Sequence, residues 1–148
     1  MNVRLAKIPA WQAKALMDGN AEVEEWASWG EILVDGTWRR FSGEAEIDGA
    51  FDDWVKLGEF GRNMIAYNIG FMNGFSFHRV PASFDGVVPK RIDPMFHAVM
   101  ACGYASMSEL RTIYSLEDVF LMLDSITTTR LNEKIAMDAA QATANGGF

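Results

Sequence analysis

The chain has 148 residues, of which 49% are hydrophobic and 12% aromatic, and its formal net charge at pH 7 is −7. This length can bury the core of a globular domain, and the aromatic content argues against disorder. The negative charge argues against nucleic acid and anionic membranes as partners, because phosphate binding needs a basic surface. The single cysteine excludes an internal disulfide and an all-cysteine metal site.

The sequence shows the pattern of neither a signal peptide nor a membrane-spanning segment. The first residues lack the apolar run followed by small residues that is typical of a signal peptide. No apolar stretch approaches the roughly 18 residues that a membrane span needs. We therefore expect a soluble protein inside the cell.

Charge is unevenly distributed along the chain. Between residues 18 and 59 there are twelve acidic and three basic residues, whereas between 60 and 91 there are one acidic and four basic residues. Such polarity can orient protein partners or steer self-association. It is also compatible with a simple solvated acidic face.

The first half of the chain predicts a mixture of helix and strand. Residues 8–17 favour a short helix, because Pro9 suits a first turn and Asp18-Gly19-Asn20 a stop. Residues 31–41 predict a β-hairpin, because Asp35-Gly36 tolerates the positive φ angles of a tight turn between β-branched and aromatic residues. A second turn is expected at 47–50.

Residues 51–73 have apolar side chains at three- and four-residue steps and predict a helix, with a kink or break at Gly58 and Gly61. Residues 75–80 alternate like a strand that ends before Pro81. Three of the four prolines lie in 81–94, which indicates a linker.

After the linker the pattern is helical. Residues 95–102 predict a short helix closed by Gly103, and capping motifs begin further helices at 106–109 and 115–118. Residues 119–123 are apolar in nearly every direction, so we expect them to be buried on several sides. Beyond them only Leu131, Ile135 and Ala139 form an apolar stripe, and residues 142–148 are expected to fray.

These elements predict an α+β fold that is mainly helical. The expected organisation is a small α+β unit at residues 1–90, with the hairpin at 31–41, followed by a helical unit at 91–148 with a frayed C-terminal tail. The thin stripe on the last helix is too narrow for a monomer core but wide enough to dock in a groove. We therefore hypothesise that 130–140 projects and contacts another chain through Leu131, Ile135 and Ala139; the alternative is that it folds back on the first half.

No pattern in the sequence dictates a reaction. His97 and Cys102 are five residues apart, which turns their side chains apart on a helix, and Cys102 among apolar neighbours favours a buried structural residue. The other histidine, His78, has no evident partner. The carboxylates Glu44, Glu46, Asp48, Asp52 and Asp53 lack the spacing of a calcium loop. We expect no catalytic, cofactor-binding or metal-binding residues, and hence not an enzyme.

The five tryptophans all lie in the first 54 residues. Trp26 and Trp29 are three residues apart, as on one face of a helix, and this favours packing in the core. Tryptophan is also enriched in binding interfaces, so a contact with a partner remains the other interpretation.

The segment 93–140 resembles small helical tail and virion assembly proteins of tailed bacteriophages, of the tail assembly chaperone type. The resemblance lies in Gly103-Tyr104, Ser108-Glu109-Leu110, the segment 114–119, and Asn132-Glu133 with the alanine-rich tail. It implies a non-enzymatic factor that binds a phage tail or virion component, with possible self-association of the chain. It also implies a location in the cytoplasm of an infected bacterial cell, or in the virion.

Two other classes of function stay open at this point. A small phage-encoded inhibitor or regulator would bind a host protein through the acidic surface. A small enzyme would bring His78, His97 or Cys102 together with carboxylates in a pocket.

Overall fold

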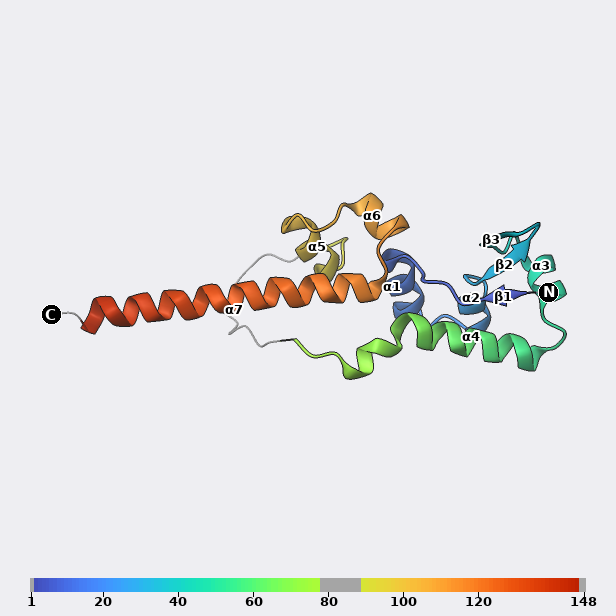
Figure 1. Cartoon of the computed structure of the whole chain (residues 1–148), viewed down its shortest axis with the longest axis horizontal. Helices are drawn as coiled ribbons and strands as arrows, with labels where there is room; N and C mark the ends of the chain where they lie inside the picture. Colours follow the sequence, from blue (N-terminus) through green and yellow to red (C-terminus); the bar gives the residue numbers. More distant parts are fainter. Residues whose placement is uncertain (1, 78–88, 147–148) are drawn as a thin grey trace.

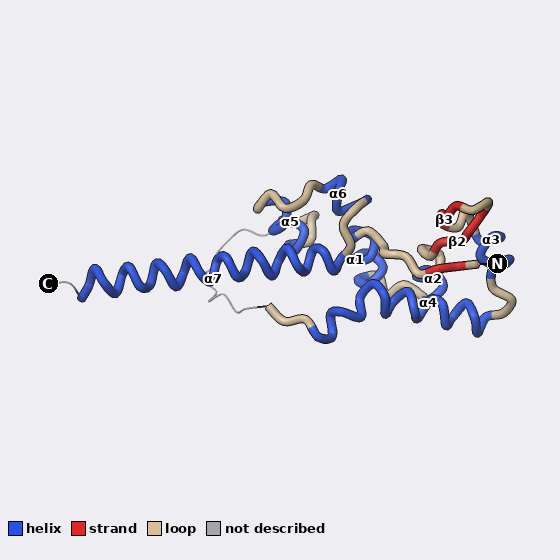
Figure 2. The backbone as a smooth tube through the Cα atoms, viewed as in Figure 1, coloured by secondary structure: helices blue, strands red, loops and turns tan. Residues whose placement is uncertain are grey.

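The computed structural model describes residues 2–77 and 89–146, and the fold is α+β and mainly helical, as the sequence predicts. A small antiparallel sheet lies at one end of an elongated molecule, and a long C-terminal helix extends to the other end (Figure 1). The colouring by secondary structure in Figure 2 shows the strands of the described residues gathered near the N-terminus.

The elements in chain order are β1 (Val3–Arg4), α1 (Ala10–Asp18), α2 (Val23–Ala27), β2 (Glu31–Val34), β3 (Thr37–Arg40), α3 (Glu44–Ala50), α4 (Trp54–Ile69), the 3-10 helix η1 (Gly70–Gly74), α5 (Pro94–Ala101), α6 (Met107–Thr112) and α7 (Leu116–Gly146).

The predicted hairpin is confirmed. Asp35 and Gly36 both have positive φ, 50° and 77°, as a tight primed turn requires, and they join β2 to β3. The two-residue strand β1 adds to the free edge of β2, with Val3 opposite Ile32, so the sheet order is β1-β2-β3. A strand this short has no sequence signal of its own, because its conformation depends on the partner strand.

Two predictions between residues 47 and 77 are wrong. Residues 47–50 belong to α3 and do not form a turn. Residues 75–77 are not in a strand, since Phe75 and Phe77 pack against Phe120 of α7, with ring centroids 5.4 and 5.5 Å away. The remainder of that expected strand, 78–80, lies outside the described residues, as does 81–88 of the expected linker.

The expected break in α4 is also wrong. The helix is continuous from Trp54 to Ile69, and Gly61 lies where the backbone of α2 crosses it. A Cβ at position 61 would lie 2.8 Å from the carbonyl carbon of Val23, so only glycine permits this approach. The α-helix ends at Ile69, and the chain continues from Gly70 as the 3-10 helix η1.

The helix ends of the second half follow the predicted caps. The Ser106 hydroxyl accepts the Glu109 N–H at 3.2 Å, and the Glu109 carboxylate accepts the Ser106 N–H at 3.0 Å. Ser115 and Asp118 make the same reciprocal pair at the start of α7. Gly103, with φ 78°, ends α5. The expected fraying of 142–148 is wrong for 142–146, because α7 continues to Gly146, and residues 147–148 lie outside the described residues.

Residues from both halves of the chain form one hydrophobic core. Its buried members include Ile8 and Trp26 from the first half, and Phe96 and Val119 from the second. The rings of Trp11 and Phe96 stack at 5.3 Å. The expected burial of 119–123 on several sides is found at Val119 and Phe120, whereas Leu121 faces solvent and is 55% exposed.

Candidate functional site

Helix α7 divides into a buried and an exposed part. Its first part contributes Leu116, Val119, Phe120 and Ile126 to the core. Leu131 is half-buried at the boundary, and every residue from 132 to 146 is exposed. We call residues 131–146 the arm; in Figure 1 it extends beyond α5 and the rest of the body.

The arm carries the three residues that the sequence singles out for interaction. Leu131, Ile135 and Ala139 are spaced by four residues, which places them along one face of the helix. Ile135 is 58% exposed, and the neighbouring Met137 is 70% exposed. The sequence pattern did not single out Met137, because it lies off the four-residue stripe.

Local interactions favour the helical conformation of the arm. Alanine occurs five times between residues 136 and 144, and alanine has the highest helix propensity. Lys134 and Asp138 form an ion pair one turn apart at 3.3 Å. An isolated helix of about 12–15 residues is nevertheless marginal in water, so packing against a partner would stabilise the arm.

The residues that could carry chemistry do not assemble into a described site. His97 is exposed on α5, and His78 lies outside the described residues. Cys102 is exposed, so the prediction of a buried structural cysteine is wrong. It follows the last turn of α5 and lines a groove of about 360 Å³ together with the nearby Tyr104 and with Ile126 and Glu133 of α7. His97 is not among the residues that line this groove.

Three of the five carboxylates near α3 have structural partners. Arg39 donates two hydrogen bonds of 2.8 Å to Glu46, and this interaction lowers the pKa of Glu46 to about 2. Asp52 pairs with Lys56 at 3.1 Å and raises the pKa of that lysine. Asp53 accepts the backbone N–H of Lys56 at the start of α4. Over residues 2–77 and 89–146, no group of three or more His, Cys, Asp or Glu could hold a metal ion.

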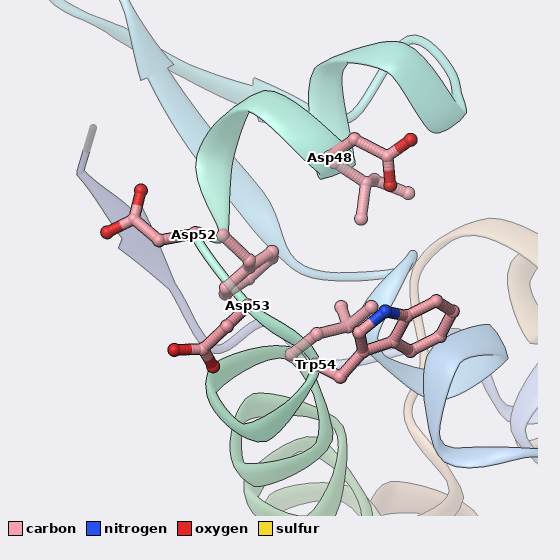
Figure 3. Close-up of a pocket in the computed structure, with 7 residues that line it drawn as sticks. Asp48, Asp52, Asp53 and Trp54 are labelled. Carbon is pink, nitrogen blue, oxygen red and sulfur yellow. The ribbon is translucent and has the colours of Figure 1, made fainter.

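The tryptophans divide between the two interpretations of the sequence. Trp26 is buried in the core, as expected for a residue on the inner face of α2. Trp54, at the first turn of α4, is 79% exposed beside a cleft of about 290 Å³. In Figure 3, Trp54 and Asp48 lie on one side of the chain, and the carboxylates of Asp52 and Asp53 point to the other.

Within the described part of the chain, no helix is both long enough and apolar enough to span a bilayer. Comparison with protein families, with curated proteins and with solved structures finds no match for this chain.

Proposed function

We propose that this protein is a non-enzymatic binding factor that holds another protein chain through the arm. The observation that carries the proposal is the exposure of α7 beyond residue 131, where Ile135 and Met137 present apolar side chains to solvent. Among the described residues, positions 132–146 of this helix are all exposed, so docking the face that carries Leu131, Ile135 and Ala139 in a groove would bury apolar surface that the folded chain leaves accessible.

The resemblance of residues 93–140 to tail assembly proteins supports a more specific form of the proposal. In this form the partner is a phage tail or virion component, such as a tape-measure protein, and the protein acts in the infected cell or within the virion. Self-association through the arm is the alternative within the same class.

The experiment is co-expression of the full chain with a candidate phage tape-measure or tail protein, followed by co-purification and light scattering. The variants Leu131→Ser/Ile135→Ser and Ile135→Ser/Met137→Ser should lose the partner. The second variant changes only exposed side chains, so its melting temperature should match that of the wild type. Ile113→Ser, which changes an isoleucine 69% exposed on another element, is the matched control and should retain the partner.

Unchanged co-purification by both arm variants would contradict the proposal. A large fall in the melting temperature of the Ile135→Ser/Met137→Ser monomer would also contradict it, because the arm would then belong to the core. A wild-type dimer that both arm variants dissociate would identify a second copy as the occupant.

A further inference from the structure

Helix α3 and the start of α4 lie at the end of the molecule opposite the arm (Figure 1), and a cleft beside Trp54 is lined by residues of this region. Its walls come from the end of α3, the connection that follows it and the first turn of α4, and its apolar lining residues are Ile47, Phe51, Trp54 and Leu57. A second groove of about 460 Å³ shares Ile47, Trp54 and Leu57 and continues toward α2. We call the two together the Trp54 cleft.

The Trp54 cleft presents unusual apolar exposure. Trp54 is 79% exposed, although it begins a helix whose later turns pack on α2. The apolar residues that line the cleft with it, Ile47, Phe51 and Leu57, are only half-buried. Contiguous exposed apolar groups rimmed by polar residues mark interaction sites on soluble proteins. Tryptophan in particular carries a large share of the binding energy where it anchors an interface.

The charge around the Trp54 cleft selects the kind of partner. Glu24 and Glu25 of α2 and Glu44 and Asp48 of α3 line the second groove. None of these four has a Lys or Arg within ion-pair distance among the described residues, whereas the nearby Glu46 and Asp52 are paired with Arg39 and Lys56. Over residues 2–77 and 89–146, these four carboxylates therefore stand beside an exposed indole without an ion-pair partner.

We propose that the Trp54 cleft binds a protein segment in which Lys or Arg side chains stand beside apolar ones. The cations would pair with Glu24, Glu44 and Asp48 and lie over the Trp54 indole, whose face attracts positive charge. The apolar side chains would cover Ile47 and Leu57. Phosphate-bearing partners are disfavoured because the same carboxylates repel them. This surface is separate from the arm, so the proposal does not depend on the proposed function.

The test uses the full chain and a fluorescein-labelled peptide that alternates Lys and Leu, with fluorescence anisotropy as the readout. A peptide with Glu in place of Lys is the charge-reversed probe. The wild type should bind the Lys peptide and not the Glu peptide, and affinity should fall as salt rises. Trp54→Ala should weaken binding by about tenfold or more, because it removes the exposed anchor.

Two variants that remove the same amount of charge distinguish binding at the Trp54 cleft from general electrostatic attraction to an acidic protein. Glu44→Gln/Asp48→Asn in the cleft and Glu133→Gln/Asp138→Asn on the arm change the net charge equally. Only the pair of substitutions in the cleft should weaken binding of the Lys peptide. The indole N–H resonance of Trp54, identified by its loss in Trp54→Ala, should shift during titration with the Lys peptide. The arm variant Ile135→Ser/Met137→Ser should bind the Lys peptide normally, so failure of one proposal leaves the other intact.

Three outcomes would overturn the proposal. The first is equal weakening by the cleft and arm charge pairs, which would indicate general electrostatic attraction. The second is Lys-peptide affinity that Trp54→Ala does not change. The third is a wild-type dimer that Trp54→Ala dissociates, which would assign the cleft to a second copy of the chain.

Discussion

The side-chain oxygen of Asn68 accepts a hydrogen bond of 2.7 Å from the backbone N–H of Ile8, within the core. The amide nitrogen of Asn68 donates to the carbonyl oxygens of Ala6 and Met64, at 3.1 and 2.9 Å. One polar side chain on α4 thereby satisfies the backbone of the segment that joins β1 to α1. This segment in turn precedes the helix whose first N–H, at Ala10, donates to Tyr114 next to the start of α7.

We expect Asn68→Ala to lower the free energy of unfolding by about 2–3 kcal/mol, because it leaves the buried Ile8 N–H and Ala6 carbonyl without partners. Asn63→Ala, at an exposed position of the same helix, should change stability by no more than about 0.5 kcal/mol. Urea unfolding followed by circular dichroism measures both. Similar effects of the two substitutions would show that the Asn68 network does not stabilise the fold.

Gly61 and Gly58 lie one turn apart on α4 and should respond in opposite ways to alanine. A Cβ at Gly61 would collide with the backbone of Val23, so Gly61→Ala should destabilise the protein by about 1–3 kcal/mol. A Cβ at Gly58 would meet only the end of the flexible Arg62 side chain, at 3.3 Å. Gly58→Ala should therefore raise stability by up to about 1 kcal/mol through helix propensity. Thermal unfolding of the two variants distinguishes these effects; equal changes would contradict the close approach of α2.

The Arg39–Glu46 pair should make stability depend on pH. The pKa of Glu46 is lowered from 4.5 to about 2 in the folded chain, so its contribution is present above pH 4.5 and is lost as the pH falls toward 2. Glu46→Gln should be less stable than the wild type at pH 6, and the two should converge near pH 2. Glu44→Gln, an exposed neighbour on α3, serves as the control. A constant gap between wild type and Glu46→Gln across this range would refute the assignment.

Exposed Cys102 should react with a thiol reagent in the native protein at a rate comparable with that of the urea-denatured chain. Cys102→Ser should abolish the reaction and change the free energy of unfolding by no more than about 0.5 kcal/mol, because the side chain is not part of the core. Labelling that requires denaturant would restore the interpretation of a buried cysteine.

The sequence by itself determined the features that depend on residues a few positions apart. The Asp35-Gly36 turn, the Ser106–Glu109 capping box and the glycine stop at Gly103 were all predictable. Each is specified by backbone conformation or by a hydrogen bond within one turn of helix, and such interactions leave a local pattern. The mainly helical α+β class follows from the same signals.

Tertiary structure decided what the local pattern could not. Gly61 looks like a helix breaker until α2 crosses it, and Asn68 looks like a surface residue until the segment before α1 supplies its partners. The exposure of Cys102, Leu121 and Trp54 likewise depends on which elements cover them. Asn68 and Ile8 are 60 positions apart, and contacts at such separations leave no periodic trace in the sequence. Burial is therefore a property of the assembled chain, whereas turns and caps are properties of its short segments.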